Sequence, residues 1–249
     1  MKAQKAEPYS GFAEFYDEML GATAFECFRE NFERLSNRYS MHFETAADIA
    51  CGTGLAAQYL ARRCGRVYAV DRSEAMLAVA ASRVYGGEVI IVRQSFEELE
   101  LPERVDLLTC NFDSLNYVLD ESLLAETFAR FRSSLVDGGF AVFDMNTARE
   151  LSGWMGTEVR VHRPAGAASF WVLEWDPEAR MSTVKMTNFR RRGGAFVVSA
   201  EEHVERAYDV GPLLEMISAA GFSGVEALDA RGLGRVDEGT RRVQFVARA

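Results

Sequence analysis

The chain has 249 residues, 48% of them hydrophobic, which is enough to bury one large core. Its 37 acidic residues outnumber the 28 basic ones and give a formal net charge of −9. That balance disfavours nucleic acid as a partner, because nucleic-acid binding depends on clustered Lys and Arg. The sequence contains neither the apolar core of a signal peptide nor a membrane-spanning stretch, so we expect a cytoplasmic protein that interacts with no membrane.

From residue 46 to 146, apolar segments of β type alternate with segments of helical periodicity. The β-type segments are almost continuously apolar, which is typical of strands buried on both faces of a parallel sheet. This rhythm predicts an α/β fold with a doubly wound, mostly parallel, seven-stranded Rossmann-like sheet. Its first five strands are expected within residues 45–51, 66–71, 88–94, 105–111 and 139–146.

After residue 146 the rhythm changes. Four β-type segments follow at 157–162, 169–175, 181–189 and 195–208, separated by turn signals and by no helical pattern. They predict an antiparallel β insertion between the fifth strand and the last helix. The helix is expected within 209–222, and the two closing strands at 224–230 and 241–249. We therefore predict an N-terminal helical lid (1–45), a cofactor-binding α/β domain (46–150 and 209–249) and a β insertion that acts as a substrate lid (151–208).

The segment "GTGLAA" at 52–57 has the G-x-G-x-x-A form of a nucleotide-binding loop between a strand and a helix. Gly52 and Gly54 permit a sharp turn close to a ligand, and Asp71 ends the next predicted strand, where a carboxylate can accept hydrogen bonds from ribose hydroxyls. Several cofactors share these needs, so the loop alone does not identify the ligand.

Three ordered segments carry a family resemblance: "DIACGTG", "AVDRSEAML" and the run from Phe112 to Thr147 that begins "FDSLNYVLD". Together with "FAEFYDEM" near the N-terminus, they resemble the class I S-adenosylmethionine-dependent methyltransferases of small-molecule type. The resemblance is strong over residues 9–150. It implies an enzyme that transfers a methyl group from S-adenosylmethionine to an N or O atom of a small-molecule acceptor by in-line displacement.

Two alternatives remain beside this interpretation. One is a non-catalytic S-adenosylmethionine-binding module, because the family usually places an acidic residue after its third strand and this chain has Ser95 there. The other is a nicotinamide-dependent oxidoreductase. Its short-chain type is excluded, because the Tyr-x-x-x-Lys pair cannot occur: Lys2, Lys5 and Lys185 are the only lysines and residue 181 is Met.

The resemblance also implies roles for individual residues. The backbone near Gly52 is expected along the methionine part of the cofactor, Asp71 at the ribose, and Arg72 and Met76 beside the adenine. Tyr9 and Tyr16 are expected to close over the site as a lid. The complete predicted cofactor set is Tyr16, Asp48, Ala50, Gly52, Gly54, Asp71, Arg72, Met76, Gln94, Ser95, Phe96, Asn111 and Phe112, and the predicted substrate-binding set is Tyr9, Asn116, Tyr117 and Trp171.

The expected methyl transfer needs little general acid or general base catalysis. A sulfonium methyl group leaves a neutral thioether behind, so holding the nucleophile in line can supply on the order of 7–11 kcal/mol. A hydroxyl acceptor would require a base, and the candidates are His162, His203 and Asp113. We list His162 and His203 as the catalytic candidates and predict no metal ion. The oligomeric state is left open.

Overall fold

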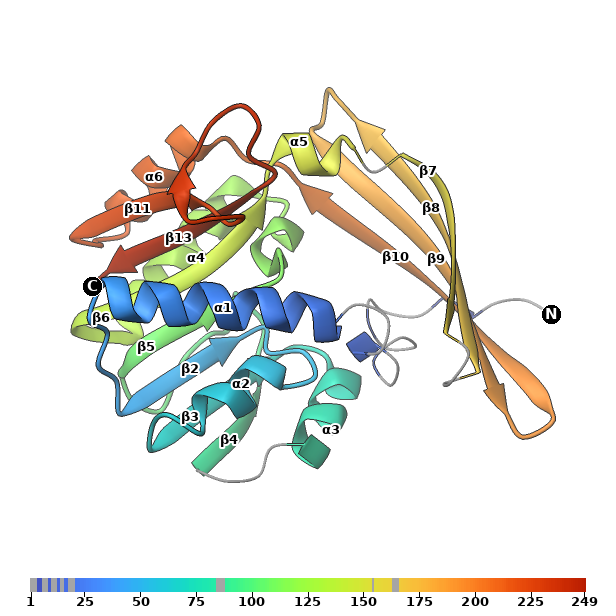
Figure 1. Ribbon diagram of the computed structural model, residues 1–249, viewed down its shortest axis with the longest axis horizontal. Helices are drawn as coiled ribbons and strands as arrows, with labels where there is room; N and C mark the ends of the chain where they lie inside the picture. The colour runs from blue at the N-terminus through green and yellow to red at the C-terminus, as the bar shows by residue number, and fades with distance from the viewer. Residues whose placement is uncertain are drawn as a thin grey trace.

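The computed structural model describes residues 4–5, 9, 13, 16–17, 21–83, 88–153, 155–162 and 166–249. Figure 1 shows two β-sheets: a central sheet flanked by helices, and a second sheet that extends away from it. None of the helices in these ranges is both long and apolar enough to cross a membrane.

The central sheet has the order β12-β11-β13-β6-β5-β2-β3-β4. Strands β4, β3, β2, β5 and β6 pair in parallel, whereas β13 is antiparallel to β6 and β11 to β13. This confirms the predicted mostly parallel sheet, to which the two-residue β12 adds an eighth, edge strand. The strands are β2 (Thr45–Ile49), β3 (Arg66–Asp71), β4 (Glu88–Arg93), β5 (Val105–Cys110), β6 (Leu135–Asn146), β11 (Gly224–Asp229), β12 (Gly234–Arg235) and β13 (Arg242–Arg248).

Helices pack on both faces of this sheet. On one face, α1 (Ala22–Arg38), α2 (Leu55–Leu60) and α3 (Glu74–Arg83) form one buried cluster that includes Phe32, Leu60 and Leu77. On the other face, α4 (Glu121–Ser133) and α6 (Val210–Ala219) form a second cluster around Phe128 and Ile217. Because the strands are buried on both faces, their segments read as continuous apolar runs.

The second sheet has the order β1-β10-β9-β8-β7. It consists of β1 (Gln4–Lys5), β7 (Gly156–His162), β8 (Ala167–Asp176), β9 (Met181–Arg192) and β10 (Ala195–Arg206). Its four long strands pair antiparallel, as the sequence predicts, and β1 joins β10 in parallel. The division into domains and the function of this sheet as a lid remain predictions.

One face of the second sheet is partly apolar and buried. Trp171, Leu173, Val184 and Met186 form a small cluster there, while Phe170, one residue along β8, is 41% exposed. This alternation follows the two-residue period of a strand. In Figure 1 the sheet rises beside the edge of the central sheet at which β2, β3 and β5 end, so a space between the two sheets is where a site is expected.

Candidate functional site

The parallel strands end at one edge of the central sheet, and this edge collects most of the predicted cofactor residues. Ala50 follows β2, Asp71 ends β3, Gln94 follows β4, and Asn111 and Phe112 follow β5. In open α/β sheets, ligands bind beyond the carboxyl ends of the strands, at the point where the strand order reverses. Here the reversal lies between β2 and β5, directly beside the glycine loop.

The glycine loop is held by the carboxylate of Asp71. The Gly52 N–H donates to Asp71 Oδ2 at 2.8 Å, and the Ser73 N–H donates to Asp71 Oδ1 at 2.8 Å. Gly52 has φ +54° and Gly54 has φ +80°, so both occupy the left-handed region that favours glycine. The two glycines therefore shape the turn, and the acidic residue of the next strand supports it.

A cavity of about 160 Å³ adjoins this loop. It brings together ten of the thirteen predicted cofactor residues, along with the predicted substrate residues Tyr9 and Tyr117. The ten are Tyr16, Ala50, Gly52, Asp71, Arg72, Met76, Gln94, Ser95, Phe96 and Phe112. We call this space the nucleotide-side cavity.

The other three predicted cofactor residues, Asp48, Gly54 and Asn111, do not line the cavity. Asp48 and Asn111 are each only 2% exposed and lie behind the lining. Asp48 accepts a hydrogen bond from Thr109 through Oδ1, but its Oδ2 and both amide atoms of Asn111 have no hydrogen-bond partner. Buried polar groups left without partners are uncommon and often mark a binding site.

Gln94 and Ser95 are the two polar candidates for an adenine contact, and both already form hydrogen bonds with nearby residues. Gln94 is hydrogen-bonded to the backbone N–H and C=O of Glu100, and the Ser95 hydroxyl donates to Glu98. Glu97 lines the cavity as well and is not among the residues predicted from the sequence. The available signal was the pair of glutamates after Phe96. Glu97 lies two positions after Ser95, where the family usually has its acidic residue.

The N-terminal segment is attached to the glycine loop by contacts that no sequence pattern indicated. The Thr53 hydroxyl donates to Asp17 Oδ1 at 2.5 Å, and the Arg83 guanidinium donates to the same hydroxyl at 3.2 Å. Arg83 also forms an ion pair with Asp17. These contacts bring Tyr16, the neighbour of Asp17, to the mouth of the nucleotide-side cavity. Phe12 and Phe15, two further aromatic residues of the N-terminal segment, lie outside the described residues.

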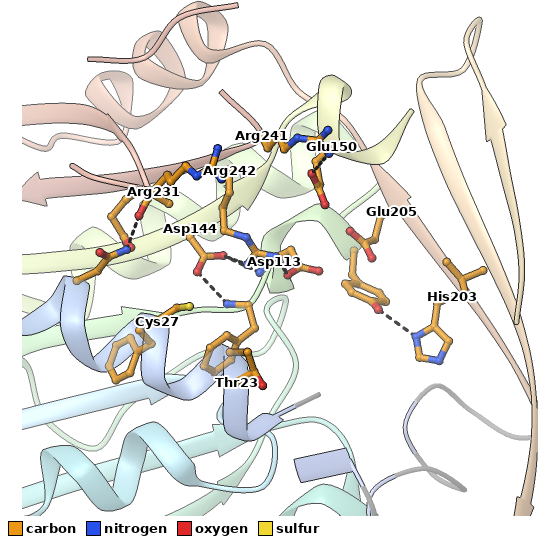
Figure 2. Close-up of a pocket in the computed structure, with 18 of the residues that line it drawn as sticks. Thr23, Cys27, Asp113, Asp144, Glu150, His203, Glu205, Arg231, Arg241 and Arg242 are labelled. Carbon is orange, nitrogen blue, oxygen red and sulfur yellow. Dashed lines mark hydrogen bonds and ion pairs between the residues drawn. The ribbon is translucent and has the colours of Figure 1, made fainter. Parts of the chain in front are cut away.

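A second cavity of about 920 Å³ lies between the two sheets, and Figure 2 shows part of its lining. We call it the acceptor-side cavity. Arg242 lies in its wall and pairs with Asp113 at 2.6 Å and with Asp144 at 2.9 Å. Glu205, 4% exposed, lies close to Asp113 and forms no ion pair with a described Lys or Arg.

Asp113, Asp144, Glu205 and Arg242 form a largely buried charged cluster, in which burial and the neighbouring charges shift the pKa values of Asp113, Glu205 and Arg242. Burial raises the pKa of Glu205 well above its usual range, and the negative charge of Asp113 raises it further. Burial also raises the pKa of Asp113, although Arg242 opposes that shift. Burial disfavours the charged form of Arg242, but the Asp113 and Asp144 carboxylates outweigh it and raise the pKa of its guanidinium. The surroundings therefore favour the protonated form of Glu205 next to the ion-paired Asp113.

The remaining predicted substrate and catalytic residues are placed differently. Trp171 and His203 line the acceptor-side cavity. Asn116 is fully buried: its amide N–H groups donate to the carbonyls of Asn146 and Arg206, and its side-chain oxygen accepts from the Asn146 N–H. Asn116 thereby joins η3 (Ser114–Tyr117) to β6 and β10, and its role in substrate binding remains a prediction. His162 ends β7, and its side chain lies outside the described part.

Four aromatic residues line both cavities: Tyr9, Tyr16, Phe112 and Tyr117. Tyr9 and Phe112 adopt positive φ angles of 66° and 60°, a conformation that costs energy for bulky side chains and persists where the surroundings enforce it. These rings form the junction between the nucleotide-side and acceptor-side cavities. A group that passes from a bound cofactor to a bound acceptor has to cross this junction.

The fold and this site define a class of protein, one that binds a nucleoside-containing cofactor at the edge of a doubly wound sheet and holds a second molecule beside it. Residues 46–139 match a family model described as a methyltransferase domain. A relative from Geobacillus sp. (strain WCH70), described as a methyltransferase, is 26% identical over 96% of this chain and 99% of its own.

Two further similarities agree with this. A dTDP-3-amino-3,6-dideoxy-alpha-D-glucopyranose N,N-dimethyltransferase of Streptomyces fradiae is 28% identical over 55% of this chain and 54% of its own length. A solved S-adenosylmethionine-dependent methyltransferase from Clostridium acetobutylicum superimposes with a TM-score of 0.82 and 23% identity, over 96% of this chain and 98% of the other. Residues 46–139 are therefore a methyltransferase domain, and the chain has the fold of the class I S-adenosylmethionine-dependent methyltransferases, whose cofactor is S-adenosylmethionine.

The residues beside the glycine loop fit this cofactor. A Cβ atom added to Gly52 would meet no atom within 4 Å and would project from a residue that lines the nucleotide-side cavity. The unpartnered atoms of Asp48 and Asn111 lie behind this lining, at the same carboxyl end of the parallel strands. The open space at Gly52 is expected of a site that binds a nucleoside joined to an amino acid.

Asp48 gives the free protein a pH-dependent stability. Burial raises the pKa of its carboxyl from about 4 to about 7, partly opposed by the hydrogen bond from Thr109. Between these values the folded state binds one proton more than the unfolded state, so the free energy of unfolding falls as pH rises from about 4 to 7. Asp48→Asn should remove this slope, which amounts to a few kcal/mol at about 1.4 kcal/mol per pH unit.

The measurement is urea denaturation of the wild-type protein and the variant across this pH range. Asp106→Asn is the matched control. Burial opposes the Asp106 charge, but hydrogen bonds from the backbone of Thr45 and Glu44 lower its pKa. The stability that Asp106 contributes is present at neutral pH and lost as the pH falls, so its difference curve should have the opposite sign. Equal slopes for wild type and Asp48→Asn would contradict the buried, protonated state of Asp48.

Proposed function

We propose that this chain transfers the methyl group of S-adenosylmethionine to a nitrogen or oxygen atom of a small-molecule acceptor by in-line displacement. The observation that carries the proposal is the pair of adjoining cavities. The nucleotide-side cavity lies at the glycine loop, the acceptor-side cavity lies between the two sheets, and four aromatic residues form the junction between them.

The lining of the acceptor-side cavity favours an acceptor that has both polar and apolar parts. Trp171, Leu173 and Met186 offer an apolar wall from the second sheet, while Asp113, beyond β5, and Glu205, near the end of β10, add acidic groups to the lining. Such a mixture, enclosed by two sheets, suits a molecule of metabolite size. An amino sugar is one such molecule, and the Streptomyces fradiae relative is named for methylating one.

The residues of this chain bind and position the reactants. Asp71, next to Gly52, would hold the ribose hydroxyls, Met76 and Phe96 would cover the adenine, and the backbone from Ala50 to Gly52 would follow the amino-acid part. The bound cofactor supplies a sulfonium methyl group that leaves a neutral thioether. Tyr16 and Phe112 line the junction, where a cation over the face of an aromatic ring would be stabilised by about 0.5–2 kcal/mol for each ring.

The experiment combines binding with turnover. Calorimetry should show that S-adenosylhomocysteine binds and that NADH does not. The protein with methyl-labelled S-adenosylmethionine is then offered amino sugars, cyclic amines, phenols and alcohols of similar size, and products are detected by mass spectrometry. Transfer to at least one amine or hydroxyl compound is expected. Cofactor binding without transfer to any of these compounds would contradict the proposal and favour a non-catalytic binding module.

A further inference from the structure

A chain of hydrogen bonds leads from the junction into the second sheet. The hydroxyls of Tyr9 and Tyr117 lie 2.7 Å apart, and the Tyr117 hydroxyl lies 3.0 Å from Nδ1 of His203. Nε2 of His203 lies 3.3 Å from Glu201 Oε2. The link between the tyrosine and His203 is drawn as a dashed line in Figure 2. The chain therefore connects the N-terminal segment, η3 and β10.

The donor and acceptor in each of these hydrogen bonds are fixed by Glu201, which lies at the inner end of the series. A carboxylate oxygen only accepts hydrogen bonds, so Nε2 of His203 is the donor toward Glu201 Oε2, which also accepts from the Tyr9 backbone N–H at 2.7 Å. A neutral imidazole with its proton on Nε2 has only Nδ1 as an acceptor. The Tyr117 O–H therefore donates to Nδ1, and its oxygen accepts from the Tyr9 O–H.

Tyr9, at the outer end of this series of hydrogen bonds, can then accept one more hydrogen bond. Tyr9 donates its only hydroxyl proton to Tyr117, and its oxygen retains its acceptor capacity at a residue that lines both cavities. Burial raises the pKa of both tyrosines well above their usual range, so both remain neutral phenols that can accept and donate in the same step. His203, at 3% exposure, is the basic group at the inner end.

We propose that Tyr9, Tyr117 and His203 form a proton wire that removes the proton from the acceptor's nucleophilic N–H or O–H group, with Glu201 as the positioning residue for His203. This inference rests on the proposed function and adds a catalytic route to it. Tyr9 is the residue that contacts the acceptor, and its backbone N–H anchors it to the same Glu201 that orients the ring.

The step balances without a further reactant. The acceptor atom forms its bond to the methyl carbon with its own electron pair, and the electrons of the C–S bond return to sulfur. The proton of the acceptor passes to the Tyr9 oxygen, the Tyr9 proton to the Tyr117 oxygen, and the Tyr117 proton to Nδ1 of His203. The imidazolium that results is stabilised by Glu201.

Several groups besides Glu201 face His203. Tyr9 packs edge-on against its ring at 4.7 Å between centroids, Tyr117 approaches from η3, and Glu205 follows on the same face of β10. Strand β9 places the uncharged Val184 opposite His203. The charged groups near the ring are therefore acidic, which suits a ring that becomes an imidazolium during turnover.

The first test needs no acceptor. The sequence has only three histidines, so ¹⁵N NMR of histidine-labelled protein, assigned with His203→Ala, can report the state of this ring. At neutral pH we expect the neutral tautomer with its proton on Nε2, and Tyr117→Phe should shift the Nδ1 resonance by removing its hydrogen bond. A proton on Nδ1, whether in the other neutral tautomer or in a doubly protonated ring, would overturn the proposal, because Nδ1 could then accept nothing.

The second test uses the acceptor that the wild-type protein methylates. Tyr9→Phe, Tyr117→Phe and His203→Ala should each lower kcat by about 10- to 100-fold, the low end of general-base effects, and should remove the acid limb of the pH–rate profile. His203→Ala should leave the affinity for S-adenosylhomocysteine within a few-fold, and the exposed His42→Ala is the control that should change neither quantity.

The double variant Tyr9→Phe/His203→Ala separates a wire from independent contributions. If the residues act in one wire, breaking it at a second point costs nothing more. The kcat of the double variant should then be no lower than the kcat of the less active of the two single variants. Losses that multiply, or an acid limb that survives in His203→Ala, would overturn the wire. If the NMR result is as expected but no acceptor is methylated, the wire is supported and it is the proposed function that fails.

Discussion

Gly52→Val should weaken the binding of S-adenosylhomocysteine by more than about 100-fold. The φ of +54° at Gly52 costs roughly 1–2 kcal/mol for an L-residue, more for a β-branched one, and the new side chain would enter a cavity of only about 160 Å³. The Gly52 N–H also donates to Asp71, so a shift of the backbone would disturb that contact too. Calorimetry with S-adenosylhomocysteine measures the loss.

Gly193→Val is the matched control for this substitution. Gly193 has a φ of +61°, and an added Cβ would likewise meet no atom within 4 Å, but it lies in the turn between β9 and β10 and lines neither cavity. Both variants should lose similar thermal stability, whereas only Gly52→Val should lose cofactor affinity. Near-normal binding by folded Gly52→Val would mean that the cofactor does not approach this loop.

The fold and the nucleotide-side cavity were largely predictable from the sequence, because both depend on local patterns. Apolar runs identify strands buried on both faces, and a parallel sheet brings the residues after its strands to one edge whatever the details of packing. Ala50, Asp71 and Phe112 follow from this rule alone. Asn111 satisfies the same rule, yet its side chain lies behind the lining, because one residue of shift from Phe112 reverses the direction of a side chain. Asp48 lies within β2, before the strand ends, and is buried there.

The acceptor-side cavity was much less predictable, because its contacts join distant segments. Arg242 meets Asp113 across 129 positions of sequence, and Tyr117 meets His203 across 86. The alternation in "EEHVER" does indicate that Glu201, His203 and Glu205 share one face of a strand. It does not reveal whether that face points toward the central sheet or toward solvent, which depends on how the second sheet is placed.

Asn116 illustrates a different limit of prediction from the sequence. A polar residue in a loop beyond a strand end is a reasonable candidate for ligand contact, and the family resemblance suggested one. In the structure its amide satisfies the backbone of two other elements at the point where β6 gives way to α5 (Ala148–Leu151) and β10 ends. Because buried backbone groups require partners, a fold with two sheets needs such side chains, and no short-range pattern distinguishes them from ligand contacts.

Asp71→Ala should weaken the binding of S-adenosylhomocysteine by about 2–3 kcal/mol, roughly 30- to 150-fold, in the range for hydrogen bonds to a charged group. The structure gives this residue two roles that the substitution removes together. Its carboxylate already accepts from the Gly52 and Ser73 N–H groups, and each oxygen retains capacity for a ribose hydroxyl. A simple loss of affinity therefore does not distinguish a ribose contact from a loosened loop.

A thermodynamic cycle separates the two roles of Asp71. Calorimetry is performed with S-adenosylhomocysteine and with its 2′,3′-dideoxy analogue, on wild type and on Asp71→Ala. If the carboxylate binds the ribose, wild type should prefer the hydroxylated ligand by about 2 kcal/mol, and the variant should show almost no preference. If it only supports the loop, both proteins should discriminate equally while the variant binds both ligands less well. The second pattern would refute the ribose contact and leave Asp71 as a support for Gly52.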